Sequence, residues 1–197
     1  MPKVTEEHRV ARRAQIVAAA RSCVIDQGFH KTTMADVIAA SELSAGAVYG
    51  YFKSKEEIVA AIAEEALSSV DELFENAMVG DEPLSPTLVL ERVLKHIVSI
   101  ADRPGGDVTK IALQAWAESL RNPAVKAIAE GKYRMLRGRF VEVARRAQAD
   151  GTIPADADPE VVAQVLFGFV PGFILQRLLL GDVTAESYTA GLRAILR

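Results

Sequence analysis

The stretch of residues 32–58 constrains the fold more than any other part of the chain, because it reads as two short helices joined by a tight turn. Thr33 is a suitable N-cap for a helix over 34–41, and Ser44 is a suitable N-cap for a second helix over 45–52. Helices of about two turns are not stable alone. Both must therefore be held by packing against the rest of the chain.

The second of these helices has one apolar face and one open face. Val48 and Phe52 are four residues apart and are expected to face the core. The opposite face carries three small residues and a tyrosine: Ala45, Gly46, Tyr49 and Gly50. Small side chains let the backbone approach a surface closely, and the free N–H groups at a helix N-terminus favour phosphate. This layout is typical of a helix that lies in the major groove of DNA.

Polar groups near this helix extend the predicted DNA-binding site. Tyrosine hydroxyls can donate hydrogen bonds to phosphate oxygens, lysines bring positive charge, and a threonine hydroxyl at a helix N-terminus can add another contact. The alternative is that the tyrosines pack beneath the next helix and the lysines are ordinary surface residues. The predicted DNA-binding residues are Thr33, Ser44, Ala45, Gly46, Tyr49, Tyr51, Lys53 and Lys55.

The distribution of charge agrees with this interpretation. The formal net charge of the 197 residues is −3, which alone argues against a DNA-binding protein. However, residues 1–55 hold 8 Lys and Arg against 5 Asp and Glu, whereas residues 56–197 hold 15 against 21. The basic part coincides with the two-helix stretch, as expected when phosphates are the partner. An asymmetry of this size also arises by chance, so it supports the interpretation without deciding it.

The same stretch resembles the DNA-binding domain of the TetR (tetracycline repressor) family. The resemblance covers about 50 N-terminal residues, and Ser41-Glu42 in the turn is similar to the multidrug-binding repressors of the QacR type. The residues that carry the resemblance are Gly28-Phe29, Thr32-Thr33, Ser44, Gly46, Val48-Tyr49, Tyr51-Phe52 and Lys55-Glu56.

Two positions depart from the pattern of the family. Many members carry Lys or Arg where this chain has Ala45, and a large residue where it has Gly50. We therefore expect few direct contacts between side chains and bases. Specificity is expected to depend on close backbone approach at Gly46, on contact of Ala45 with thymine methyl groups, and on DNA shape.

The remainder of the chain is also predicted to be helical, with no strand pattern and no repeat. Pairs of a capping residue and a proline mark the helix starts at Ser85-Pro86, Asn122-Pro123 and Asp158-Pro159. Together with a long N-terminal helix over 5–27, we expect helices over 55–78, 86–101, 107–120, 123–150, 159–181 and 185–195.

These nine helices predict an all-α fold with the layout of the TetR family. An N-terminal three-helix helix-turn-helix DNA-binding domain is expected over 1–54, and a six-helix ligand-binding and dimerisation domain over 55–197. Half of the residues are hydrophobic, which is enough for a sizeable core.

The helix over 159–181 is apolar on both faces, which exceeds what one side of a small core needs. Two glycines four residues apart would let a partner backbone come close. We therefore predict a homodimer through this helix and the next one, although the alternative is a buried central helix in a monomer. Two-fold symmetry would fit a palindromic operator in double-stranded DNA. The predicted dimerisation residues are Gly168, Phe169, Gly172, Phe173, Tyr188 and Leu192.

The resemblance also implies a small-molecule effector, expected to be apolar or amphipathic, in a pocket of the C-terminal domain. The alternative is that each candidate is a plain core residue, which is the more common role of such a residue. The candidate pocket residues are Phe74, His96, Ile100, Leu113, Trp116, Tyr133, Phe140 and Phe167.

Other functional classes have little support in the sequence. There is no glycine-rich phosphate loop and no nucleophile elbow, so we expect no enzyme, no catalytic residues and no cofactor. His8, His30 and His96 lack a paired ligand spacing, which makes a metal site unexpected. Cys23 is the single cysteine and has no disulfide partner. The N-terminus has no apolar core, and no uncharged apolar run reaches 18 residues, so we expect a cytoplasmic protein with no membrane partner.

The sequence therefore predicts a ligand-responsive transcriptional regulator, most simply a repressor released from its operator by a small molecule. A non-catalytic helical adaptor with an incidental helix-turn-helix is the alternative, and affinity for duplex DNA separates the two.

Overall fold

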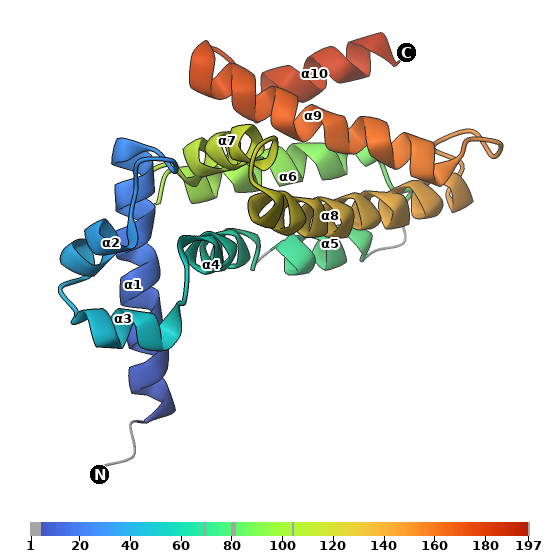
Figure 1. Cartoon of the computed structure of the whole chain (residues 1–197). Coiled ribbons are helices and arrows are strands. Elements are labelled where there is room, and N and C mark those ends of the chain that lie inside the picture. The colour runs from blue at the N-terminus through green and yellow to red at the C-terminus, as the bar shows by residue number, and fades with distance from the viewer. Residues whose placement is uncertain (1–4, 69, 80–81, 104, 197) are drawn as a thin grey trace. The chain divides into compact units, whose positions relative to one another are not determined.

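The computed structural model in Figure 1 describes residues 5–68, 70–79, 82–103 and 105–196, and these ranges contain helices and no strand. The all-α fold expected from the sequence is confirmed. The helices are α1 (Glu6–Gln27), α2 (Met34–Ser41), α3 (Ala45–Tyr51), α4 (Lys55–Leu67), α5 (Val70–Met78), α6 (Pro86–Ala101), α7 (Val108–Ser119), α8 (Pro123–Ala149), α9 (Pro159–Leu179) and α10 (Ala185–Ile195).

Short polar side chains begin the two small helices at the predicted places. Thr33 and Asp36 form a capping box at the start of α2, and the Ser44 hydroxyl accepts a backbone N–H at the start of α3. Gly28 follows α1 with a φ of 88°, a conformation that suits glycine. Phe52 lies just beyond α3, so this helix is one residue shorter than expected.

The helix expected over 55–78 is divided in the structure. α4 ends at Leu67 and α5 begins at Val70, with Ser68 in a turn between them and residue 69 outside the described ranges. The loop expected after α5 and the break expected before α7 also include undescribed residues, namely 80–81 and 104.

The chain forms two compact units, and the expected division at residue 54 into a DNA-binding and a ligand-binding domain stays a prediction. The first unit consists of Met1–Ala66 and Ile100–Ala129, and the second of Leu67–Ser99 and Glu130–Arg197. α7 therefore belongs to the same unit as α1, α2 and α3. The first unit is built from two stretches of sequence that are separated by more than thirty residues of the second unit.

The core of the first unit holds the two short helices against longer ones (Figure 1). Val37 of α2 and Val48 of α3 are 1% and 0% exposed, and they pack with apolar residues of α1 and α4. The core also includes Ile111 of α7 and Val125 of α8. Tertiary packing thus supplies the stability that α2 and α3 lack by themselves.

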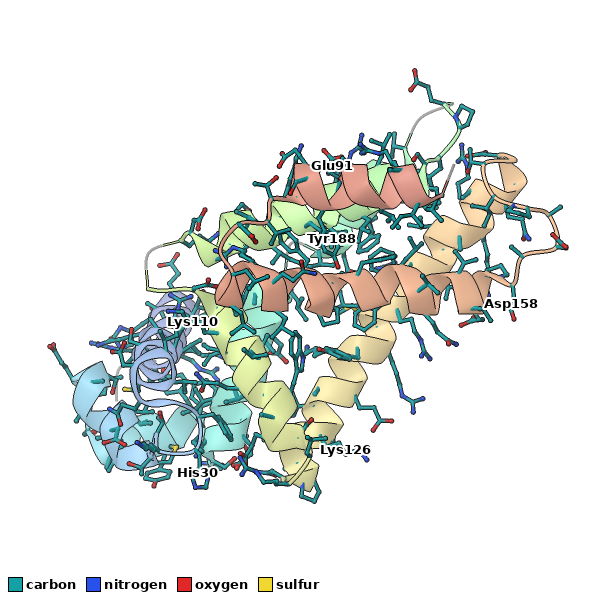
Figure 2. All side chains as sticks on the ribbon, turned by 90° about the horizontal axis from the view of Figure 1, so that it is seen from above. His30, Glu91, Lys110, Lys126, Asp158 and Tyr188 are labelled. Carbon is teal, nitrogen blue, oxygen red and sulfur yellow. The ribbon has the colours of Figure 1, made fainter. Side chains whose placement is uncertain are left out.

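An ionic network links α6 and α10 in the second unit. The Glu91 carboxylate accepts from the Thr189 hydroxyl at 3.1 Å and pairs with Lys95 at 2.8 Å and with Arg193. Lys95 also pairs with Glu186 at 3.0 Å. Hydrogen bonds from Lys95 and Arg193 lower the pKa of Glu91 to about 2, so the carboxylate stays charged at neutral pH. Figure 2 shows Glu91 beside α10.

α9 is apolar around most of its surface. Ala163, Leu166, Phe173 and Ile174 are buried in the second unit, and other apolar residues face outward. Of the described helices it alone is long and apolar enough to cross a membrane. Length and composition are weak evidence for that, because a helix that packs against protein on both faces passes the same test.

Candidate functional sites

α3 presents the open face that the sequence predicted. Ala45, Gly46, Tyr49 and Gly50 are exposed, whereas Val48 is fully buried. A Cβ atom added at Gly46 or at Gly50 would meet no heavy atom within 4 Å. The backbone of α3 at Gly46 and Gly50 is therefore open to close approach by another molecule.

The side chains of α3 offer few hydrogen-bonding groups. Its sequence, AGAVYGY, contains no charged or amide side chain, so tyrosine hydroxyls are its only polar side-chain groups. Tyr49 is 43% exposed, whereas Tyr51 is half-buried and packs against the core of the first unit. The Lys53 ammonium donates to the Tyr49 carbonyl at the end of α3. Tyr49 thus remains the most accessible polar group of the helix itself.

The hydroxyls of Thr33 and Ser44 are used as helix caps. Thr33 Oγ1 donates to Asp36 Oδ2 at 2.7 Å and accepts the Asp36 N–H at 3.2 Å. The Thr33 hydroxyl and the Thr33 backbone N–H both donate to Asp36 Oδ2, and these two hydrogen bonds lower the pKa of the Asp36 carboxyl. Ser44 Oγ accepts the Ala47 N–H at 3.2 Å. The Thr33 hydroxyl hydrogen is therefore engaged inside the domain, which makes a phosphate contact through it a weaker expectation than the sequence suggested.

Lys55 has a structural role that the sequence did not reveal. Its ammonium donates to the Phe29 carbonyl at 2.8 Å and to the Thr32 carbonyl at 3.0 Å. The same Nζ atom lies 4.3 Å from the centre of the Phe29 ring. Lys55 therefore ties the start of α4 to the turn between α1 and α2. Its predicted contact with phosphate stays a prediction and would use the remaining donor.

Replacing Lys55 by methionine is expected to destabilise the protein by about 2 kcal/mol, because two carbonyls lose a charged donor and a cation–π contact is lost. Urea unfolding monitored by circular dichroism measures this change. Lys31→Met is the matched control, since Lys31 is an exposed lysine near the same turn, and it should unfold like the wild type. Equal stability of the two variants would contradict a structural role for Lys55.

Two of the residues predicted for dimerisation on α9, Phe169 and Phe173, pack against a third, Tyr188 of α10, within one subunit. Phe173 is 0% exposed, Leu192 is buried, and the ring of Tyr188 packs edge-on against Phe169 and Phe173 at centroid distances of 6.2 and 5.5 Å. A Cβ atom at Gly172 would lie 3.0 Å from the Tyr188 hydroxyl. Figure 2 shows Tyr188 between the two helices. Phe173 and Leu192 are therefore buried in the core of the single chain, and their part in dimerisation stays a prediction.

A different face of α9 is exposed and apolar. Val161 and Val165 are 53% and 58% exposed, and Leu179 is 70% exposed. Gly168 lies on the same face with open space where its side chain would be. We call Val161, Val165, Gly168, Leu175 and Leu179 the outer face of α9. The sequence showed that both faces are apolar, but it could not show which one packs inside the subunit.

Four of the candidate pocket residues form one aromatic cluster in the second unit. Phe74 and Phe140 are in edge contact at 5.2 Å, Phe140 is 6.4 Å from Phe167, and Phe167 is 4.9 Å from Tyr133. Burial raises the pKa of the Tyr133 hydroxyl, so it stays protonated at neutral pH. These four rings come from α5, α8 and α9.

The other four candidates do not join this cluster. His96 lines an open groove between α5 and α6 together with Glu72, Asn76 and Arg92. Ile100, Leu113 and Trp116 belong to the first unit. The candidate pocket residues were selected by residue type and expected helix. In the structure they are distributed over two units and a surface groove.

Comparison with known proteins assigns both parts of the chain. Residues 16–62 match the tetR family of bacterial regulatory proteins. This matched range contains α2 and α3. Residues 86–197, more than half of the chain, match the C-terminal domain of BetI-type transcriptional repressors. The chain belongs to the TetR family. It is thus a DNA-binding transcriptional regulator whose helix-turn-helix is formed by α2 and α3.

Relatives of this TetR-family regulator match it over most of its length. The regulator YfiR of Bacillus subtilis is 28% identical over 94% of this chain and 89% of its own. The structure of GusR from Salmonella enterica has a TM-score of 0.78 at 27% identity and covers 98% of this chain and 96% of its own. The triclosan complex of SmeT from Stenotrophomonas maltophilia, with a TM-score of 0.72 at 23% identity and coverage of 86% and 81%, shares the fold.

Proposed function

We propose that this TetR-family regulator is a repressor that binds a palindromic operator as a homodimer and leaves it when a small molecule binds the second unit. The observation that carries the proposal is the exposed face of α3, which lies within the residues matched to the tetR family. The match of residues 86–197 to BetI-type repressors supports repression. Regulators of this kind act on DNA in the cytoplasm and need no catalytic group, so the proposed role is not enzymatic.

In this proposal α3 lies in the major groove with Ala45, Gly46 and Gly50 against the bases. Tyr49, Tyr51 and Lys53 would contact phosphates beside this face, and Ser44, Thr33 and Lys55 would do so at its margins. The Tyr49 hydroxyl is the strongest candidate for a phosphate contact, because it is the most exposed of the phenols on α3. No group of α3 can form the bidentate contacts that arginine, asparagine and glutamine make with purines.

The operator is therefore expected to be read largely through thymine methyl groups. Replacing a contacted thymine by deoxyuridine removes only the methyl group and should weaken binding about fourfold, the value of one buried methyl-sized group. Fluorescence anisotropy with singly substituted duplexes measures this change, and the same replacement outside the half-sites is the control. If affinity instead falls when 7-deazaguanine replaces guanine, a hydrogen-bonding side chain reads the site.

The effector is proposed to be apolar or amphipathic. The chemical reason is the cluster of Phe74, Phe140, Phe167 and Tyr133, which offers ring faces and a single protonated hydroxyl inside the second unit. A ligand of this class would displace ring–ring contacts and so change the packing of α5, α8 and α9 on one another.

The dimer is proposed to form through the outer face of α9 together with α10. Large exposed apolar surfaces on a protein mark contact sites, and the outer face of α9 runs along most of the helix. The exposed small residues Ala190, Gly191 and Ala194 on α10 would permit close helix approach.

Selection of bound duplexes from a random-sequence pool tests the proposal as a whole. The expected result is an inverted repeat bound with steep salt dependence, and a loss of that affinity when apolar aromatic compounds are added. Recovery of no preferred duplex would favour the alternative of a helical adaptor.

A further inference from the structure

Both backbone groups of Phe29 are bound by side chains from distant helices. Its N–H donates to Gln114 Oε1 of α7 at 2.6 Å, and its carbonyl accepts from Lys55 Nζ of α4 at 2.8 Å. Phe29 is 4% exposed, so neither backbone group has ready access to water. A buried backbone group without a partner is costly, which makes these two side chains necessary to the turn between α1 and α2.

Gln114 uses both ends of its amide in this contact. While Oε1 accepts the Phe29 N–H, Nε2 donates to the Val24 carbonyl at 3.3 Å. The orientation of the amide is settled by its partners, because a backbone N–H can only donate and a carbonyl can only accept. Gln114 therefore joins the last turn of α1 to the residue that follows Gly28.

The turn held in this way determines where α2 begins. The Thr32 hydroxyl donates to the Gly28 carbonyl at 2.9 Å, and the Thr32 carbonyl accepts from Lys55 at 3.0 Å. Thr33 is the next residue and forms the capping box that starts α2. A shift of Phe29 would therefore be passed to the first turn of α2, and from α2 to α3, against which it packs in the helix-turn-helix.

Further contacts fix α7 to the rest of the first unit. Ile111 contributes to its core, and Asn122, directly before α8, donates to Glu56 Oε1 of α4 at 3.4 Å. Gly106, before α7, packs closely on Ile25 of α1. Gln114 makes the polar contact between α7 and the turn before α2.

We propose that Gln114, more than fifty residues beyond the helix-turn-helix, is a positioning residue for DNA binding. It touches no DNA and acts by holding Phe29, which sets the place of α2 and α3. A displacement of α7 would loosen this hold and lower the affinity for the operator without altering any group that meets the phosphates.

The test uses the full-length protein and the duplex selected with the wild type as the probe. Gln114→Met keeps the length and helix propensity of the side chain and removes both hydrogen bonds. We expect the variant to remain helical, to bind the duplex about tenfold more weakly, and to keep the wild-type slope of affinity against salt, because no phosphate contact is lost. Hydrogen exchange at the Phe29 amide should become faster.

Gln148→Met is the matched control. Gln148 also donates its amide to backbone carbonyls, at 2.8 Å to Ala155 and 2.9 Å to Ala157, but it lies in the second unit. It should lower the melting temperature and leave the operator affinity unchanged at temperatures where the protein is folded. The proposal is overturned if Gln114→Met binds within twofold of the wild type, if its salt slope falls by about one unit, or if Gln148→Met weakens binding equally.

Discussion

Replacing Gly46 by valine is expected to abolish specific operator binding, with a loss of affinity of about a thousandfold or more, since a thousandfold is the lower end of the usual gap between specific and non-specific complexes. The reason is steric, since a branched side chain on the open face of α3 would hold the helix away from the base edges. The fold should be unaffected, because a Cβ atom at Gly46 meets no heavy atom within 4 Å. Anisotropy with the selected operator measures the first effect and thermal unfolding the second.

Gly138→Val is the control for this prediction. Gly138 is also an exposed glycine inside a helix with open space around its Cβ position, but it lies on α8 in the second unit. Its substitution should change neither stability nor affinity by a large factor. Operator binding by Gly46→Val at wild-type strength would show that α3 does not approach the DNA closely.

Replacing Val165 by glutamate is expected to convert the dimer into a folded monomer and to weaken operator binding by about a hundredfold or more. Val165 is 58% exposed in the single chain, so the charge costs little there. In a dimer formed through the outer face of α9, two such carboxylates would be buried without partners, at a cost of several kcal/mol each. Two half-sites would then no longer be bound as one unit. Light scattering gives the mass, and anisotropy gives the affinity.

Leu120→Glu serves as the control, because Leu120 is 88% exposed and follows α7 in the first unit. That variant should remain a dimer with unchanged affinity. Phe173→Glu cannot serve this purpose, since Phe173 is completely buried within the subunit and the substitution would unfold it. If Val165→Glu is a dimer of wild-type affinity, the outer face of α9 is not the interface.

The helix-turn-helix could be predicted from sequence because its determinants are local. Thr33 and Ser44 cap helices through hydrogen bonds to residues three positions away, and the burial of Val48 follows from its spacing within the helix. The starts of α8 and α9 are signalled in the same way, by the pairs Asn122-Pro123 and Asp158-Pro159. These features depend on a few neighbouring residues and can therefore be predicted without knowledge of the tertiary structure.

The features that the sequence did not predict depend on contacts between distant residues. Because α9 is apolar on both faces, its sequence does not show which face packs inside the subunit. The buried Phe173 and the exposed Val165 could therefore not be distinguished from sequence. Lys55 matched the family motif, and nothing in its local sequence indicated the bonds to Phe29 and Thr32. Gln114 has no motif at all, since its two partners lie 85 and 90 residues away.

The discontinuous make-up of the first unit bears on how regulators of this kind can be recombined. A chimaera that exchanges only the segment before residue 66 would separate Phe29 from Gln114, which accepts its N–H. Phe29 would then face the residue that the acceptor protein carries at this position of α7. We therefore expect that both segments of the first unit, Met1–Ala66 and Ile100–Ala129, must be transferred together to transfer DNA reading. Crossovers that transfer both together should yield hybrids that retain the donor's operator, whereas single crossovers should yield hybrids that fold and read DNA poorly.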